Sequence, residues 1–482
     1  MKNRTRSLLV VGVMLAATAY VPAQQGEPPA VARSRELLAA VNSGGDVLRR
    51  FIADNFSKSF LDFAPVDRHI DVLGSLRSGG ELTIETVQPL ARTESRLVLR
   101  SAQSSERRAM RVAVDPAPPH RIRNIAVGPQ AVPPVAMEDV SDAGIVRALG
   151  TLFDRICEND GFSGTVMLSL DGQQLFQRAC GLANRADRVP MRIDTKLNLG
   201  SMNKMFTAVA IAQLVEAGKL AFDDPVGKHL PEYPIADVTS KVRIQHLLTH
   251  TSGLGSHFTE EFQNASRTRF RTVRDFMAIV EKQKPAFEPG TRWQYSNSGF
   301  MLLGAIVEKV SGRSYFDYVR EHLYQPAGMT DTGEYEMDEP VANLGIGYVR
   351  DREQPSRWRN NLFIHTIKGG PAGGRFSTVG DLTRFANALR SGKLVKKATW
   401  EMLASAKPEL NSPDYGYGFA ISGDGDMVGH SGGFPGISAQ LAIYLKSGYA
   451  IAALSNYGAP APTVVDQVRA LLYQRQHGRR TN

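Results

Sequence analysis

The chain has 482 residues, of which 42% are hydrophobic and 22% charged, and its formal net charge is +9 at pH 7. A chain of this length forms two or more domains, since a single domain has roughly 100 to 200 residues. The apolar fraction is typical of a globular protein, which argues against a disordered chain. The basic residues form no long run, which argues against a nucleic-acid-binding segment.

The first 23 residues have the pattern of a secretory signal peptide. Three basic residues, Lys2, Arg4 and Arg6, precede an apolar stretch that ends at Ala17, and a small-residue cleavage site ends at Ala23. We expect cleavage near Ala23 and export to the periplasm or the medium. An uncleaved anchor is the alternative, although the apolar run is short for a membrane span. No segment of the mature chain is apolar enough to span a bilayer.

Residues 24–130 are predicted to form a small α+β domain. It opens with helical patterning over 34–41 and 46–55. Alternating apolar residues then predict four strands, over 82–87, 96–101, 108–114 and 121–127. The proline-containing segment 131–142 is interpreted as a linker. No group of residues in this small domain points to a chemistry.

Residues 143–476 are predicted to form the larger domain, followed by a tail over 477–482. A helix is expected over 145–157, and then a β-hairpin whose strands cover 165–170 and 174–179. Strand patterns return only near the end, over 417–421, 438–444 and 450–455. The expected fold class is therefore α+β, an antiparallel sheet flanked by helices beside an all-helical region.

The chain has two cysteines, Cys157 and Cys180. In an exported protein they are permitted to form a disulfide. The spacing leaves a pair of buried free thiols equally open, and neither cysteine has metal-ligand spacing.

Ser201-Met202-Asn203-Lys204 matches the S-x-x-K pattern, at the start of an apolar helix expected to end near Glu216. Helix positions three apart share one face, so the Lys204 amine can reach the Ser201 oxygen. A neutral Lys204 would then take the Ser201 proton, and the helix N-terminus favours the negative charge that develops. The pattern does not decide the matter alone, because serine is a common helix N-cap.

The triplet Tyr295-Ser296-Asn297 places a phenol and an amide on one short loop before a helical stretch over 299–310. Tyr295 is a candidate to pass a proton to a leaving group, and Asn297 is a candidate to hold a substrate carbonyl or the Lys204 amine. A buried tyrosine beside a turn-forming asparagine would leave the same pattern.

A third motif, Gly429-His430-Ser431-Gly432-Gly433, directly precedes the strand expected over 438–444. Small residues let a backbone pass close to a substrate. The backbone amides of Gly433 and Ser201 are therefore candidates for a two-donor oxyanion hole.

The same motif also fits G-x-S-x-G, the nucleophile elbow of α/β-hydrolases, with Ser431 as nucleophile and Asp466 and His477 following in order. The elbow requires a strand before it and a helix after it. Here strand-like sequence follows instead, and the run of βα units is missing.

His246 and His250 have the H-x-x-x-H spacing of zinc-binding helices, and His257 lies beyond them. Leu247 stands where zinc peptidases carry their catalytic Glu. We interpret these histidines as structural loop residues and predict no metal site.

The order S-x-x-K, Y-x-N and H-x-G resembles the superfamily of class C β-lactamases, DD-peptidases and serine esterases. The resemblance covers about residues 143 to 475, and four stretches carry it, 199–207, 246–254, 371–374 and 429–437. It implies Ser201 as nucleophile, Lys204 as general base and Tyr295 as general acid and base. It also implies Asn297, His430, Ser431 and Gly432 as substrate contacts, an oxyanion hole at Ser201 and Gly433, and no metal or organic cofactor.

One departure from the resemblance concerns the substrate. Where class C β-lactamases carry the lysine of a K-T-G triplet, this chain has His430-Ser431-Gly432. That favours hydrolysis of small esters, amides or D-peptides over efficient β-lactam hydrolysis. A true β-lactamase, a DD-carboxypeptidase and a penicillin-sensing or inactive binding protein are the alternatives. The sequence does not determine the oligomeric state.

Overall fold

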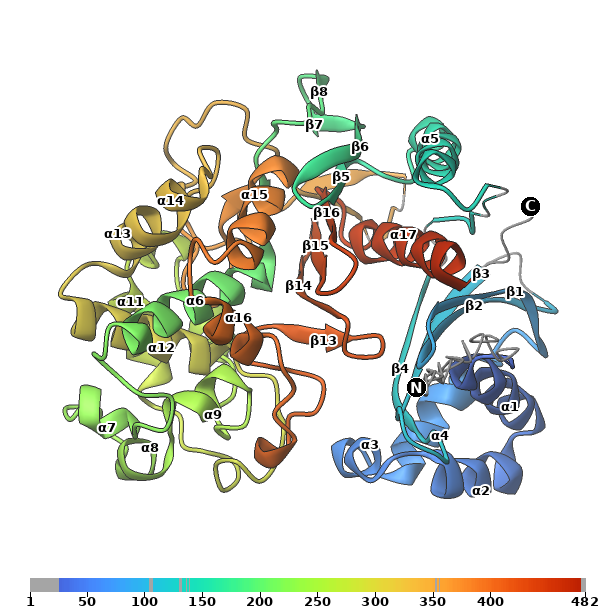
Figure 1. Ribbon diagram of the computed structural model, residues 1–482, viewed down its shortest axis with the longest axis horizontal. Helices are drawn as coiled ribbons and strands as arrows, with labels where there is room; N and C mark the ends of the chain where they lie inside the picture. Colours follow the sequence, from blue (N-terminus) through green and yellow to red (C-terminus); the bar gives the residue numbers. More distant parts are fainter. Residues whose placement is uncertain are drawn as a thin grey trace, which may run out of the picture.

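The computed structural model describes residues 26–103, 107–129, 132–135, 137, 139–351, 353–354 and 356–477. It contains a small helix-and-sheet unit from the N-terminal part of the chain, and a larger unit beside it (Figure 1). The signal peptide expected over 1–23 lies outside the described residues, as does the tail beyond His477. The predicted α+β class is confirmed.

The small unit packs four helices against one antiparallel sheet of order β1-β2-β3-β4. The helices are α1 (Pro29–Ser43), α2 (Gly45–Asn55), α3 (Lys58–Phe63) and α4 (Val66–Ser75). The strands are β1 (Leu82–Ala91), β2 (Glu94–Ser101), β3 (Arg107–Val114) and β4 (Ile122–Pro129). The four strands agree with the sequence patterns, whereas α3 and α4 were not predicted. β1 is an edge strand, and it accommodates Pro89 beside a register shift.

The larger unit is built on a six-stranded antiparallel sheet of order β13-β14-β15-β16-β5-β6. Its strands are β5 (Gly164–Leu170), β6 (Gln173–Cys180), β13 (Ala420–Ser422), β14 (Met427–Phe434), β15 (Ile437–Tyr444) and β16 (Tyr449–Ser455). Helices α5 (Asp142–Glu158) and α17 (Pro460–His477) cover one face (Figure 1). The sheet therefore joins both ends of the larger unit, as expected.

Two expectations for the end of the chain were wrong. The strand expected over 417–421 is shorter and runs over Ala420–Ser422, and the glycine-rich segment Met427–Phe434 is itself a strand. β14 forms despite its glycines because it pairs with β13 on one side and β15 on the other. The motif around His430 thus lies within the sheet rather than before it. Helix α17 was not predicted either.

The other face of the sheet carries helix α6 (Asn203–Glu216), which is buried on nearly all sides, and α15 (Val379–Arg390). Around α6 lie further helices: α7 (Val226–His229), α8 (Ala236–Lys241), α9 (Ile244–Leu248), α10 (Glu260–Asn264), α11 (Val273–Val280), α12 (Asn297–Ser311), α13 (Tyr315–Val319), α14 (Gln325–Ala327) and α16 (Lys397–Leu403). Short strands complete the unit: β7 (Leu182–Asn184), β8 (Val189–Pro190), β9 (Leu197–Asn198), β10 (Tyr348–Arg350), β11 (Trp358–Asn360) and β12 (Phe376–Ser377). None of the helices within the described ranges is both long and apolar enough to cross a bilayer.

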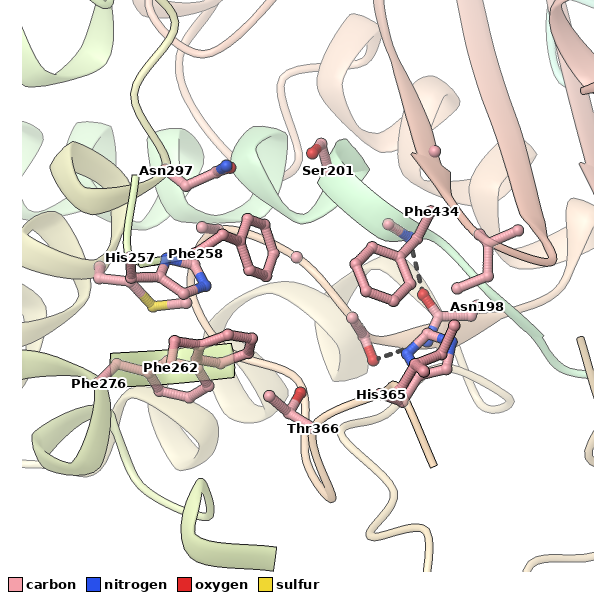
Figure 2. A pocket seen from close by; sticks show the side chains of 18 residues that line it. Asn198, Ser201, His257, Phe258, Phe262, Phe276, Asn297, His365, Thr366 and Phe434 are labelled. Atoms are coloured by element: carbon pink, nitrogen blue, oxygen red, sulfur yellow. Dashed lines mark hydrogen bonds between the residues drawn. The ribbon is translucent and has the colours of Figure 1, made fainter. Parts of the chain in front are cut away.

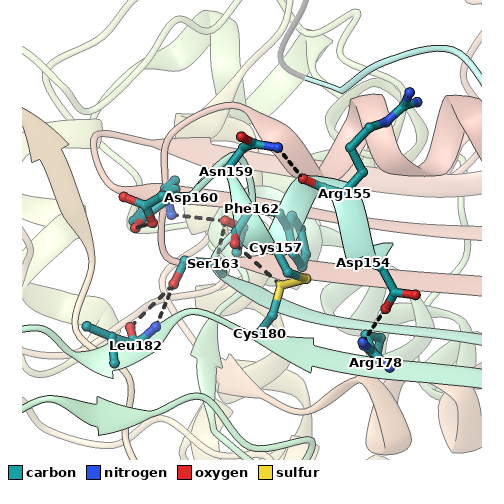
Figure 3. The surroundings of a disulfide bond; sticks show 12 residues. Asp154, Arg155, Cys157, Asn159, Asp160, Phe162, Ser163, Arg178, Cys180 and Leu182 are labelled. Carbon is teal, nitrogen blue, oxygen red and sulfur yellow. Dashed lines mark hydrogen bonds and ion pairs between the residues drawn. A yellow bond between two sulfur atoms is a disulfide. The ribbon is translucent and has the colours of Figure 1, made fainter. Parts of the chain in front are cut away.

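Cys157 and Cys180 form a disulfide that joins the end of α5 to the end of β6 (Figure 3). The two residues are 23 apart in the sequence. Reduction is therefore expected to lower the free energy of unfolding by about 2–4 kcal/mol, because the unfolded chain regains the entropy of an open loop. Thermal unfolding of the protein and of a Cys157→Ser/Cys180→Ser variant, with and without reductant, checks this. An unfolding temperature that responds to reductant in the variant as well would contradict it.

A buried ion pair connects the small unit to α17. Arg469 Nη2 lies 2.6 Å from Glu94 Oε2, and the two side chains are 1% and 5% exposed. Glu94 Oε1 also accepts a hydrogen bond from the Gly423 backbone amide at 2.7 Å, in the turn between β13 and β14. Burial by itself would raise the pKa of Glu94, but Arg469, Arg111 and the Gly423 amide together lower it to about 2.

Arg469→Met is expected to lower the free energy of unfolding by about 3–5 kcal/mol, because it leaves Glu94 buried without its cation. In the unmutated protein the pKa of Glu94 falls on folding, from 4.5 to about 2. Its contribution to the free energy of unfolding is therefore complete above pH 4.5 and is lost as the pH falls toward 2. Denaturant unfolding at several pH values measures both effects. Arg475, on the same helix but a third exposed in its pair with Asp142, is the matched control, and Arg475→Met should cost no more than about 1 kcal/mol.

Candidate active site

Ser201 lies in the turn that leads from β9 into α6. The preceding Gly200 has φ +51°, a left-handed conformation that favours glycine. Its amide donates to Asn198 Oδ1 at 2.9 Å, and the Leu199 amide donates to the Arg375 carbonyl at 2.7 Å. These bonds hold the turn, so Ser201 stands at the N-terminal end of a buried helix, as predicted.

Lys204 is fully buried one turn further along. Its Nζ donates to Asn297 Oδ1 at 2.8 Å and to the Ala372 carbonyl at 2.7 Å. Burial lowers the pKa of Lys204 well below its ordinary value. A neutral amine has two N–H bonds, and both are used by these carbonyl oxygens, so its lone pair stays available to accept a proton.

Tyr295 lies beside these two residues. Its ring centre is 4.8 Å from Lys204 Nζ, and the Ser201 side chain lies close enough to its hydroxyl to influence the pKa of the phenol. Burial raises the pKa of Tyr295 to about 12, although the neighbouring Ser201 side chain acts in the opposite direction. The phenol is therefore protonated at neutral pH and can donate a proton.

Asn297 is the first residue of α12, and its amide connects two parts of the site. Its Oδ1 accepts from Lys204, and its Nδ2 donates to Ser256 Oγ at 3.1 Å. The cap of α12 is Ser296, whose Oγ accepts from the Gly299 amide at 2.8 Å. Asn297 is thus fixed by the helix start and oriented by its partners.

Strand β14 passes close to the turn that carries Ser201. A Cβ atom on Gly432 would lie 1.8 Å from the Leu199 carbonyl oxygen, and one on Gly200 would lie 2.9 Å from the Gly433 nitrogen. Only glycine fits at these two positions. The approach brings the Gly433 amide to the Ser201 turn, where the two-donor oxyanion hole was predicted. Ser431 is exposed on the same strand.

His430 points away from this surface and is buried. Its Nδ1 lies 2.6 Å from the Ser431 carbonyl, and its Nε2 lies 2.8 Å from the Tyr415 hydroxyl. A carbonyl can only accept, so Nδ1 carries the proton and Nε2 accepts from Tyr415. Burial, reinforced by Lys204, lowers the pKa of His430 to about 3. The imidazole is therefore neutral, and its role as a substrate contact stays a prediction.

The residues of the elbow alternative do not come together. Ser431 lies in an antiparallel strand with β15 after it, so no helix follows the serine. Asp466 pairs with Arg469 at 3.3 Å. His477 Nδ1 bonds the Tyr473 carbonyl at 3.0 Å. Neither group is oriented toward Ser431.

His246 and His250 do not share a helix face. Helix α9 ends at Leu248, and His250 has φ +62°. His246 Nδ1 accepts from the Arg243 amide at 3.2 Å, and His250 Nδ1 accepts from the Ser296 amide at 3.0 Å. Both rings therefore hold loops in place, and His250 supports the Tyr295 loop directly. In the ranges that the structure describes, no group of three or more His, Cys, Asp or Glu residues is arranged to hold a metal ion.

A cavity of about 80 Å³ opens beside Ser201 (Figure 2). Ser201, Asn297 and Gly433 are among its lining residues. The rest of its wall includes four phenylalanines, Phe258, Phe262, Phe276 and Phe434. A single water needs roughly 10–15 Å³, so the cavity holds a group of several non-hydrogen atoms. Its place beside the serine marks it as a substrate pocket.

Sequence patterns did not single out three groups that complete the site. The Ala372 carbonyl binds Lys204, Ser256 orients Asn297, and Tyr415 binds His430. Ala372 lies in the 371–374 stretch, and the glycines of this stretch are the sequence feature that could have indicated its place in the site. A Cβ on Gly373 would lie 3.0 Å from the Gly200 carbonyl oxygen, so this stretch must pack against the serine turn.

These groups together can perform acyl transfer. Ser201 lies beside a protonated phenol, the buried Lys204 amine with its lowered pKa is adjacent, and strand β14 brings the Gly433 amide to the serine turn. Burial causes both the low pKa of Lys204 and the high pKa of Tyr295. These pKa values suit Lys204 to act as a base and Tyr295 to act as an acid.

Comparison with known proteins gives concordant results. A family model described as "Beta-lactamase" matches residues 151–475. The chain is 33% identical over 327 residues to "Penicillin-binding protein 4*" of Bacillus subtilis, covering 64% of this chain and 71% of the relative. It is 34% identical over 248 residues to "Esterase EstB" of Burkholderia gladioli, covering 49% and 62%. A crystal structure of a penicillin binding protein from Bacillus halodurans superposes with TM-score 0.61 at 32% identity, covering 66% of this chain and 99% of that one.

Proposed function

The chain belongs to the β-lactamase family of serine hydrolases, and from this premise we propose that it is an exported hydrolase that cleaves small esters, amides or D-peptides through an acyl-enzyme on Ser201. The observation that carries the proposal is the pair of bonds from Lys204 to Asn297 and Ala372. They hold the buried Lys204 amine, whose pKa burial lowers, one helical turn from Ser201 and beside the Tyr295 ring.

Acylation follows from this arrangement. The Ser201 proton passes to Lys204 Nζ while Oγ bonds to the substrate carbonyl carbon, and the carbonyl oxygen takes negative charge facing the Ser201 and Gly433 amides. The bond to the leaving group then breaks, the leaving group takes the Tyr295 proton, and the Lys204 ammonium returns a proton to Tyr295. Water repeats the cycle in deacylation, losing a proton to the same relay and releasing Ser201 and a carboxylic acid.

The acylated residue identifies this mechanism directly. We propose mass spectrometry of the intact chain and of its peptides after brief exposure to an activated ester. The expected result is one acyl group on Ser201 that disappears on longer incubation. An acyl group on another residue, or ester turnover without any acylated residue, would overturn the proposal. A single stoichiometric burst without turnover would favour the penicillin-sensing alternative.

Substrate choice is expected to favour neutral esters over β-lactams. The residue at the K-T-G lysine position is His430, which is buried, neutral and bonded to Tyr415, so it offers no cation to a β-lactam carboxylate. The relative named an esterase supports the same choice. We predict that kcat/KM for a short-chain p-nitrophenyl ester exceeds that for a chromogenic cephalosporin. A preference for the cephalosporin would favour the β-lactamase alternative and would leave the Ser201 mechanism untouched.

Export is the remaining part of the proposal. It is supported by the N-terminal signal pattern and by the Cys157–Cys180 disulfide, since disulfides persist in oxidising compartments. N-terminal sequencing of the protein from cell fractions tests it. The expected result is a mature chain beginning near Gln24 outside the cytoplasm, and a full-length cytoplasmic chain would contradict it.

A further inference from the structure

The cavity beside Ser201 has an apolar wall that the proposed mechanism does not use. We call this wall the aromatic pocket and define it by Phe258, Phe262, Phe276, Met301, Phe434 and His257. Its rings contact one another, with centroids 5.1 Å apart for Phe258 and Phe262 and 5.9 Å apart for Phe258 and Phe434. Figure 2 shows these rings across the cavity from Ser201 and Asn297.

The position of the aromatic pocket assigns it to one part of the substrate. Ser201 and Gly433 line the same cavity, whereas Lys204 and Tyr295 do not. The leaving group must approach Tyr295 to receive its proton. The group that continues from the carbonyl carbon into the cavity is therefore the acyl chain.

The charge of the cavity limits which acyl chains fit. Among the residues that the structure describes, none of those lining the cavity is Asp, Glu, Lys or Arg. The two histidines in it are neutral, because burial lowers the pKa of His257 to about 3 and that of His365 to about 4. A carboxylate or ammonium on the acyl chain would lose hydration and find no partner of opposite charge, which disfavours its binding. An uncharged chain would meet no such cost.

His257 is the polar group within this wall. Its side chain is buried, with the residue 3% exposed, and its Nδ1 has no hydrogen-bond partner among the described residues. Its ring lies among phenylalanines, with centroids 4.4 Å from Phe258 and 5.3 Å from Phe276. Buried polar atoms in native proteins nearly always have partners. Because His257 lines the cavity, a polar atom of a ligand held there can reach its imidazole.

We propose that the aromatic pocket is the acyl-binding subsite of this hydrolase, that it selects uncharged acyl chains bearing an aromatic ring, and that His257 hydrogen-bonds a polar group on that ring. The proposal rests on the proposed function, since it assumes that Ser201 is acylated. His257 is then a specificity-determining residue.

A set of p-nitrophenyl esters with a common leaving group tests the subsite. The acyl groups are acetyl, hydrocinnamoyl, its meta- and para-hydroxy derivatives, and a succinyl half-ester compared with its neutral methyl ester. We expect kcat/KM for hydrocinnamate to exceed that for acetate by at least about tenfold, as filling an apolar pocket does. The anionic succinyl ester should be at least about 100-fold poorer than its methyl ester.

Two variants locate the effect. Phe434→Ala should lower the hydrocinnamate-to-acetate ratio by about tenfold or more. One of the two hydroxy derivatives should have a higher kcat/KM than hydrocinnamate, and His257→Phe should remove this difference. We expect the ratio of the two kcat/KM values to fall by about two- to tenfold, as the loss of one hydrogen bond does. A purely structural defect would lower kcat/KM for the hydroxy derivative and for hydrocinnamate together, and would leave their ratio unchanged. Phe363→Ala is the matched control, because Phe363 is 90% exposed and lies outside the cavity lining.

The outcomes separate the two proposals. Turnover through Ser201 with equal kcat/KM for acetate and hydrocinnamate, or with no penalty for the anionic ester, would overturn the subsite and leave the hydrolase function intact. A hydroxy-to-hydrocinnamate ratio that is unchanged in His257→Phe would overturn the role of His257. No hydrolysis of any ester, with Ser201 never acylated, would overturn the proposed function and with it the subsite.

Discussion

Ser201→Ala is expected to abolish ester hydrolysis and covalent labelling by a fluorophosphonate. The serine stands in the turn just before α6, beside Tyr295 and one turn from the buried Lys204. Without its hydroxyl the site has no atom to form an acyl-enzyme, so kcat should fall by at least about 10⁴-fold. The assay compares steady-state rates and gel fluorescence of labelled protein.

Ser431→Ala is the matched serine control for labelling. Ser431 lies on strand β14, and the partners that would activate it, Asp466 and His477, are bonded elsewhere. Fluorophosphonate labelling should therefore persist in this variant. Labelling that survives Ser201→Ala and disappears in Ser431→Ala would reverse the assignment of the nucleophile.

Lys204→Met and Tyr295→Phe are each expected to lower the acylation rate by about 10³-fold or more, and the double variant should be little worse than either single one. In the proposed mechanism the two side chains form one proton relay, so losing either interrupts the same path, and Nζ lies 4.8 Å from the Tyr295 ring. Rapid-mixing measurement of the p-nitrophenol burst gives the acylation rates. Additive losses, or near-normal acylation in Tyr295→Phe, would remove Tyr295 from the relay.

Two other variants control for the loss of a buried lysine or tyrosine. Lys407 is buried and donates to the Met402 and Ser405 carbonyls, and Tyr233 is buried and donates to the Val280 carbonyl at 3.1 Å. Neither lines the cavity. Lys407→Met and Tyr233→Phe should change stability while folded enzyme acylates at the normal rate.

Because burial lowers the pKa of Lys204, acylation should fall only as the pH drops far enough to protonate that amine.

Much of this protein follows from its sequence, because the patterns involved are local. Alternating apolar residues predicted the strands of the small unit, and the hairpin of β5 and β6 carried its own turn signal. The spacing of Ser201 and Lys204 places both on one helix face whatever surrounds the helix. Together with Tyr295 and Asn297 it also indicated the family, and the family model confirms that resemblance.

Tertiary structure decided the features that depend on distant segments. The glycines of β14 have low strand propensity, and only pairing with β13 and β15 makes them a strand. The bond from Lys204 to the Ala372 carbonyl spans 168 residues, and the disulfide required the ends of α5 and β6 to meet. Burial, which sets the pKa values of Lys204, Tyr295 and His430, is produced by the whole packed core. Whether a side chain is charged, and which face of a strand it occupies, is therefore decided by residues far away in the sequence.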